Sequence, residues 1–266
     1  MAMVNDLTGI MVNDKAESSI YYVRRTIEIN GERFECLELS PKTLLGRPLN
    51  EYEARYSPSR LYVVGNIPIP LPVPRVSVVG TREPSNEGIE FAKRLAENLV
   101  REKVIVVSGL ARGIDTVAHR TALERGGETI AVLGTPINVF YPPENRELQL
   151  KLMREHMVIS QFSLGSPVAR KNFVIRNRTM ALLSDATVIV EAGERTGVIS
   201  QAWESIRLGR PLFVTSVVES RNPSWLHELK RYGAEVLSDP DSLDDLLDLL
   251  PWTRSLELLE QLLRLP

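Results

Sequence analysis

Residues 75–115 read RVSVVGTREPSNEGIEFAKRLAENLVREKVIVVSGLARGID, and this stretch decides the fold. Two short apolar runs, at 76–79 and 104–107, flank residues 87–101, where apolar side chains recur on one face of a helix. Near-continuous runs of valine and isoleucine are typical of strands buried on both faces, which occur in parallel sheets with right-handed helical crossovers. The stretch therefore predicts one strand–helix–strand unit of a parallel sheet.

The same alternation continues toward the C-terminus. Further strand-like runs lie at 129–133, 158–160, 186–190 and 211–214, with helical patterns between them. We predict an α/β domain over residues 71–238, built as a doubly wound, mostly parallel sheet.

The flanking regions have different patterns. Residues 1–70 hold a tail and a small β region, in which Asn30-Gly31 between two alternating runs predicts a hairpin. From residue 66 the sequence NIPIPLPVPR places proline at every second position, which predicts an extended connector. Residues 239–266 are acidic and rich in leucine, and they predict two short C-terminal helices that cap the domain or contact a second copy.

Composition excludes several classes of protein. The chain of 266 residues has 32 Lys+Arg, 34 Asp+Glu, three histidines and one cysteine, Cys36. A single cysteine excludes an intramolecular disulfide, and a net charge of −2 excludes a globally basic nucleic-acid coat protein. No apolar run reaches the length of a membrane span, and the polar N-terminus does not resemble a secretory signal. We expect a soluble, cytoplasmic protein without metal, cofactor or membrane partner.

Candidate binding residues lie in the loops that follow the predicted strands, because parallel sheets bind ligands at the carboxyl ends of their strands. Glycines allow a ligand to approach the backbone closely, and a helix N-terminus attracts a phosphate group. An arginine binds phosphate, and an aromatic ring beside it can stack on the unpaired base of the same nucleotide. Asp115 is expected to cap the helix of the second loop, and His119 to serve packing. In each loop the alternative is a structural turn with exposed charges. The predicted site residues are Gly80, Thr81 and Arg82; Ser108, Gly109, Arg112 and Gly113; Lys171, Phe173, Arg176, Asn177 and Arg178; and Thr196 and Gly197.

The sequence contains no recognisable catalytic set. It lacks a Walker loop, the spaced glycines of a dinucleotide fingerprint, a CxxC pair and an HExxH motif, and no Ser-His-Asp set is evident. We therefore predict a binding protein rather than an enzyme.

Several segments together carry a family resemblance: VSVVGTREPS, VVSGLARGIDTVAHRTAL, GGETIAVLGTPINVFYPPENREL, KNFVIRNRTMALLSDATVIVEAGERTG and QAWESIRLGRPLFV. They resemble the DNA-processing protein A family, also called DprA or Smf. The resemblance implies an extended Rossmann-like domain that binds single-stranded DNA, usually as a dimer, and delivers a RecA-type recombinase onto DNA during natural transformation. It also implies that the basic pocket consists of Arg82, the 109–113 loop with Arg112, Lys171, Phe173, Arg176 and Arg178, with Asn177 shaping the turn or contacting a base.

The sequence departs from that family in places. Gln161 and Ser163 stand where the family commonly has Glu and Pro, Val174 replaces a proline, and Val214-Thr215-Ser216 replaces Val-Pro-Gly. The leucines at 246, 247, 250, 256, 259, 262 and 263 are the expected surface of a homodimer.

Three relatives of the same fold class give alternatives. A sensor of a nucleotide-derived ligand would use the same phosphate-binding loops. A phosphoribohydrolase with a PGGxGTxxE loop is disfavoured, because EAGERTGVISQ at 191–201 lacks the double glycine and has Ser200 and Gln201 near the place of the catalytic Glu. A carrier of a pterin-type cofactor has no residue in its favour.

Overall fold

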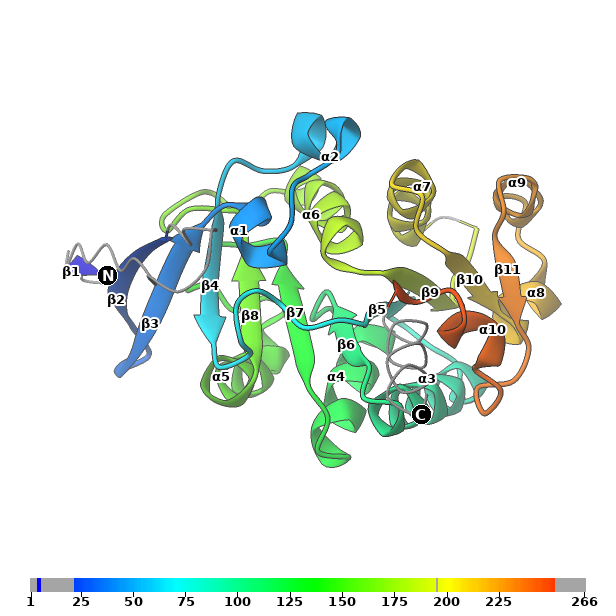
Figure 1. Cartoon of the computed structure of the whole chain (residues 1–266). Coiled ribbons are helices and arrows are strands. Elements are labelled where there is room, and N and C mark those ends of the chain that lie inside the picture. Colours follow the sequence, from blue (N-terminus) through cyan, green and yellow to red (C-terminus); the bar gives the residue numbers. More distant parts are fainter. Residues whose placement is uncertain (1–3, 6–21, 195, 252–266) are drawn as a thin grey trace, which may run out of the picture.

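The computed structural model describes residues 4–5, 22–194 and 196–251, and its strands form one sheet with helices on both faces (Figure 1). The strands are β1 (Val4–Asn5), β2 (Tyr22–Ile29), β3 (Glu32–Leu39), β4 (Leu61–Gly65), β5 (Arg75–Gly80), β6 (Ile105–Ser108), β7 (Thr129–Leu133), β8 (Met157–Ser160), β9 (Ala186–Glu191), β10 (Leu212–Thr215) and β11 (Glu235–Leu237). The α-helices are α1 (Pro41–Leu45), α2 (Glu51–Tyr56), α3 (Asn86–Arg101), α4 (Ile114–Glu124), α5 (Arg146–Glu155), α6 (Arg170–Leu183), α7 (Val198–Arg207), α8 (Ser216–Arg221), α9 (Leu226–Arg231) and α10 (Asp244–Leu247), and a 3₁₀ turn covers Pro143–Asn145.

The order of the strands confirms the doubly wound α/β fold. The sheet runs β1-β2-β3-β4-β8-β7-β6-β5-β9-β10-β11, and the pairs from β8 to β11 along this order are parallel. The chain builds outward from β5 to β8 on one side and then returns to β9 on the other side of β5. The strand order therefore reverses between β5 and β9, which is where an open α/β sheet opens a crevice for ligands.

The N-terminal β region continues this sheet. Asn30 (φ 57°) and Gly31 (φ 81°) both adopt the left-handed conformation that a two-residue hairpin needs, so the predicted hairpin of β2 and β3 is confirmed. β4 then pairs antiparallel with both β3 and β8. At the end of the proline segment Arg75 is buried, forms an ion pair with Asp185 at 3.1 Å and donates to the Leu183 carbonyl at 2.7 Å. These contacts fix the start of β5 to the turn between α6 and β9, and Nη1 of Arg75 also donates to the carbonyl oxygens of Leu71 and Pro72 in the connector, at 3.1 and 2.8 Å.

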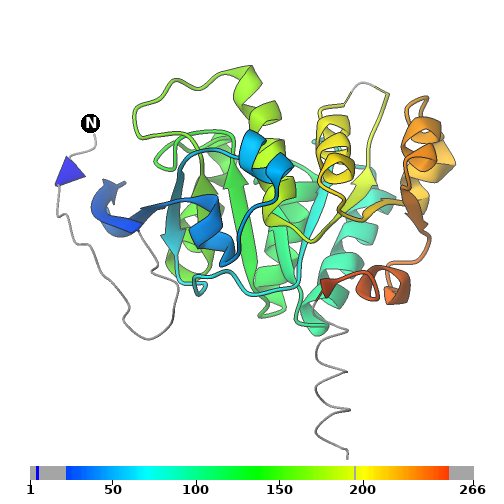
Figure 2. The same ribbon diagram turned by 45° about the horizontal axis from the view of Figure 1, so that its top comes forward.

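The helices form two layers over the sheet. Helices α6, α7 and α9 lie over one face and α3, α4 and α5 over the other, as Figures 1 and 2 both show. Alternate residues of β5 serve the two layers: Val76 and Val78 pack toward α3 and α4, whereas Val79 packs on the side of α6 and α7. This alternation is what a strand buried on both faces requires.

The C-terminal segment corrects one expectation. Leu246 and Leu250 are buried, at 0% and 1% exposure, in the core formed with α3 and α4. They therefore pack against their own domain and are not available as a dimer surface, and the leucines at 256, 259, 262 and 263 lie outside the described residues. Among the described residues, none of the helices is both long and apolar enough to cross a membrane.

Candidate nucleic-acid interface

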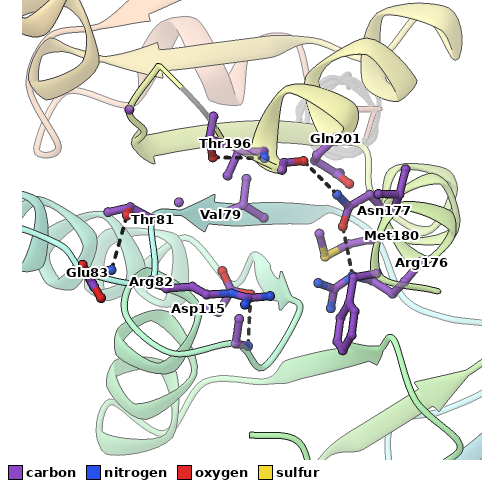
Figure 3. A pocket seen from close by; sticks show the side chains of 17 residues that line it. Val79, Thr81, Arg82, Glu83, Asp115, Arg176, Asn177, Met180, Thr196 and Gln201 are labelled. Atoms are coloured by element: carbon purple, nitrogen blue, oxygen red, sulfur yellow. Dashed lines mark hydrogen bonds between the residues drawn. The ribbon is translucent and has the colours of Figure 1, made fainter. Parts of the chain in front are cut away.

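The loops after β5, β6 and β9 meet the first two turns of α6 at the reversal point of the sheet. They enclose a cavity of about 540 Å³, shown in Figure 3. This size is within the usual range for ligand pockets. Its lining comprises Val79, Gly80, Thr81, Arg82, Glu83, Ala111, Asp115, Phe173, Val174, Arg176, Asn177, Met180, Gly193, Thr196, Gly197, Val198 and Gln201.

A second cavity of about 340 Å³ adjoins the first. It shares with the first cavity the side chains of Arg82, Phe173 and Arg176, together with Glu83 and Ala111. Its other walls come from Gly109, Arg112, Gly134 and Tyr141-Pro142-Pro143. The shared side chains thus form a ridge between two neighbouring hollows.

Arg82 supplies an available cation on this ridge. The side chain is exposed and makes no ion pair within residues 22–194 and 196–251, and its guanidinium carbon lies 5.9 Å from the centre of the Phe173 ring. Arg82 and Arg176 reach toward each other from opposite sides of the cavity (Figure 3). An exposed guanidinium with free donors suits a phosphate.

Phe173 is held in place from two sides. Its ring centre lies 5.1 Å from that of Tyr141, with the planes tilted by 45°. A Cβ atom on Gly134 would lie 2.5 Å from Cδ1 of the ring, so only glycine leaves room for it. The half-buried ring is therefore positioned before any ligand arrives.

Arg176 has a structural role that the sequence did not indicate. Only 6% of the side chain is exposed, and its Nη1 donates to the carbonyl oxygens of Gly109 and Val132, each at 2.6 Å. Nε donates to Oδ1 of Asn177 at 3.0 Å, and the Asn177 amide donates in turn to the Gly197 carbonyl at 3.2 Å. Arg176 and Asn177 thus tie α6 to strand β7 and to the loops after β6 and β9 beside the cavity.

The loop between β6 and α4 is stabilised by its own side chains. Oδ2 of Asp115 accepts from the backbone N–H groups of Gly109 and Ala111, each at 3.2 Å, and buried Ser108 donates to the Val78 carbonyl at 2.7 Å. The sequence predicts that the backbone of this glycine loop binds a phosphate, but these two N–H groups already donate to the Asp115 carboxylate. The prediction that Asp115 caps α4 is wrong, because the helix begins at Ile114 and its N-cap is Gly113.

Burial controls the ionisable groups beneath the site. It raises the pKa of the Asp115 carboxyl, an effect that the charge of Arg176 opposes. Burial also lowers the pKa of the Arg176 guanidinium, which the Asp115 charge counteracts. His119 is fully buried, its Nδ1 lies 2.7 Å from the Thr129 hydroxyl oxygen, and burial lowers its pKa to about 3. His119 is therefore a neutral packing residue, as expected.

The N-terminus of α7 completes the rim. Thr196 accepts the backbone N–H of Val198 at 3.2 Å, and the N-cap residue Gly197 has no side chain to cap the helix. Because Gly197 and Val198 line the cavity, the first turn of α7 presents its positive dipole end to it. Behind it, buried Gln201 donates to the hydroxyl oxygens of Ser77 and Thr187, each at 3.4 Å.

Three predicted cations lie apart from the first cavity. Arg178 pairs with Glu204 at 3.0 Å and packs over the Tyr56 ring, so it joins α6 to α7 and α2. Arg112 lines only the second cavity and pairs there with Glu144. Lys171 is exposed on the first turn of α6 and lines neither of the two cavities.

The predicted site residues leave out much of the lining of both cavities, and four of the omitted side chains bear on ligand binding. Met180 and Gln201 form part of the first cavity, exposed Val174 stands at its edge, and Tyr141 lines the second. Helical spacing could have found Met180, since it follows Phe173 and Arg176 at intervals of seven and four residues. Tyr141 lies in a long connection after β7 and carries no comparable signal.

Comparison with known proteins supports the resemblance. The family model described as "DNA recombination-mediator protein A" matches residues 47–248. DNA processing protein DprA of Streptococcus pneumoniae is 35% identical over 184 residues, which cover 68% of this chain and 64% of that protein. Protein Smf of Synechocystis is 36% identical over 182 residues, 67% of this chain and 45% of that protein. The chain thus spans about half to two thirds of the length of these relatives.

Solved structures agree with the fold. The crystal structure of DprA from Streptococcus pneumoniae superposes with a TM-score of 0.62 at 33% identity, covering 70% of this chain and 66% of that one. DNA processing protein A from Helicobacter pylori, whose structure concerns its single-stranded DNA binding mode, gives a TM-score of 0.61 at 25% identity, covering 72% and 88%. With the family model covering most of its length, the chain belongs to the DNA recombination-mediator protein A family, the DprA/Smf proteins.

Proposed function

We propose that this chain binds single-stranded DNA across the two adjoining cavities. The observation that carries the proposal is the pairing of Arg82, a cation without an ion pair in the described part of the chain, with the preset Phe173 ring 5.9 Å away. A cation beside an aromatic platform binds a phosphate and its unpaired base together. Duplex DNA has its bases paired and stacked, so this arrangement favours a single strand.

The charge around the site supports a polyanionic ligand. Arg170 and Lys171 are exposed on the first turn of α6, neither has an ion pair within the described residues, and no acid stands in that turn. Cations at a helix N-terminus are unfavourable with the helix dipole, so a bound phosphate chain would stabilise this segment. Because the net charge of the chain is −2, the attraction has to be local. The single-stranded DNA binding of the Helicobacter pylori relative is consistent with the proposal.

The site supports binding without chemistry. Of the two carboxylates that line the first cavity, Asp115 is buried and accepts two backbone N–H groups, and Glu83 is exposed at the rim. Gln201, near the place of the hydrolase glutamate, is an amide that cannot act as a general base at neutral pH. Among the described residues no group of three or more His, Cys, Asp or Glu is arranged to hold a metal.

A second candidate is binding of a free nucleotide. The volume of the first cavity, about 540 Å³, favours it, as does the α7 N-terminus at its rim. The same groups would hold the phosphate of either ligand, so a competition experiment has to separate the two candidates.

Fluorescence anisotropy with a labelled single-stranded oligonucleotide provides this test. We expect the single-stranded oligonucleotide to bind saturably. AMP and cyclic dinucleotides should displace it only at high concentration, and a duplex of the same length should bind more weakly. Tight binding of a nucleotide with negligible affinity for the oligonucleotide would overturn the proposal in favour of the second candidate. Equal affinity for duplex and single strand would contradict stacking of an unpaired base on Phe173.

The family resemblance also predicts self-association and delivery of a RecA-type recombinase onto the bound strand. Light scattering at micromolar protein tests the first prediction, and a monomeric mass would contradict it. An assay of recombinase filament growth on coated single strands tests the second, and unchanged growth would contradict it.

A further inference from the structure

Tyr141 is a large, exposed aromatic side chain that the binding site described above does not yet use. It stands between β7 and the 3₁₀ turn, and 41% of its surface is exposed. Its ring forms a wall of the second cavity, and a large apolar side chain left open to water inside a hollow is a feature that binding sites share.

The surroundings of Tyr141 match what a nucleotide needs. The ring lies against Phe173, which lines both cavities, so the two hollows lie on either side of the ridge. Arg112 also lines the second cavity, with 63% of its side chain exposed, and pairs with Glu144, which is itself 45% exposed. An exposed ion pair of this kind contributes little stability, so a phosphate can replace the carboxylate at small cost.

We propose that Tyr141 is a second base-stacking platform, so that two neighbouring nucleotides of one strand occupy the two cavities. The first base stacks on Phe173 in the larger cavity, with its phosphate at Arg82. The strand then crosses the ridge, and the next base stacks on Tyr141 with its phosphate at Arg112. This inference rests on the proposed binding of single-stranded DNA and adds a path for the strand.

Oligonucleotides with an abasic backbone isolate the contribution of each base. Three probes of equal length carry no base, one thymine, or two adjacent thymines, so the phosphates are constant. In the wild-type protein we expect each added base to tighten binding. Tyr141→Ala should remove the gain from the second base, a loss of about 5- to 150-fold for the two-base probe, which corresponds to about 1–3 kcal/mol. Affinity for the one-base probe should fall less, because the Phe173 ring still packs against Gly134 when Tyr141 is removed.

Controls separate stacking from folding. Tyr141→Phe keeps the ring and should bind all three probes like the wild type, whereas Tyr141→Leu keeps an apolar side chain without a π-face and should behave like the alanine variant. Tyr232→Ala removes another exposed tyrosine, which packs edge-on against Trp203 beyond both cavities, and should change nothing.

The outcomes distinguish this inference from the proposed function. If Tyr141→Ala retains the full gain from the second base while Phe173→Ala loses the gain from the first, the second platform is wrong and single-strand binding stands. If the wild-type protein gains nothing from either base, the proposed function itself fails.

Discussion

Replacing Arg176 by methionine tests whether this arginine supports the site or contacts DNA. The buried guanidinium donates at 2.6 Å to the carbonyl oxygens of both Gly109 and Val132, and it lies so close to Gly109 that a Cβ atom there would overlap it. Methionine fills similar space but offers no donor. We therefore expect Arg176→Met to destabilise the fold.

The magnitude follows from the two carbonyl groups left without their donor. A buried polar group that loses its partner costs about 1–3 kcal/mol, so two such groups cost about 2–6 kcal/mol. Because Arg176 lines the first cavity, we expect water to reach the freed carbonyl groups in part after the substitution, which gives the lower part of that range, about 2–4 kcal/mol of unfolding free energy. Arg82→Met removes an exposed arginine without an ion pair among the described residues and should change stability by less than about 0.5 kcal/mol.

Urea denaturation measures both variants. Arg176→Met should unfold at a lower midpoint with an unchanged m-value, while Arg82→Met should unfold like the wild type. A wild-type midpoint for Arg176→Met, combined with a weaker salt dependence of DNA binding, would refute the structural role and identify Arg176 as a phosphate contact.

Three further predictions follow from individual side chains. Gly134→Ala should displace the Phe173 ring, whose Cδ1 would lie 2.5 Å from the new Cβ, and lower single-strand affinity by anisotropy about 5-fold or more. Tyr232→Ala, which lies outside both cavities, is the control, and equal affinity of the two variants would contradict the role of the ring. The pKa of His119 is about 3 in the folded protein, against an ordinary value of 6.5. Between pH 6.5 and 3 the unfolded state therefore binds a proton that the folded state does not. The free energy of unfolding falls as the pH falls through this window, by up to about 1.4 kcal/mol per pH unit. His119→Gln should flatten the curve of unfolding free energy against pH in this window, and an equally steep curve would argue against burial as the cause. Arg178→Ala should lower stability by about 1 kcal/mol or less without changing the salt dependence of binding, because its guanidinium is engaged by a carboxylate; a reduced salt slope would show a phosphate contact instead.

The fold was largely predictable because its signals are local. The apolar run at 129–133 coincides with β7, and Asn30-Gly31 specifies its hairpin through two left-handed residues. The pairing of β4 with β8 was beyond this reasoning, since it aligns Val63 with Ile159 across almost a hundred residues. The strand β11 was missed because its three residues begin with an exposed glutamate and form no apolar run.

The site was predictable in place but not in the roles of its side chains. Loops after parallel strands converge at one edge of the sheet, which brought Thr81, Arg82 and Thr196 to one cavity with the start of α6. Within α6, residues two apart do not share a face, so Arg176 and Arg178 had to point to different surroundings. Sequence pattern gave no means to tell that Arg176 would be buried against backbone carbonyls, because those carbonyls lie far away in the sequence, one in the loop after β6 and one in β7.

The salt dependence of oligonucleotide binding tests the central claim most directly. Wild-type protein, Arg82→Ala and Phe173→Ala are titrated with one labelled single strand at several salt concentrations. We expect Arg82→Ala to reduce the slope of log K against log salt by about 0.7, the value for one lost contact to a single-strand phosphate. Phe173→Ala should weaken binding by about 1–3 kcal/mol at every salt concentration with the slope unchanged. If both variants bind with the affinity and slope of the wild type, DNA does not bind at this ridge.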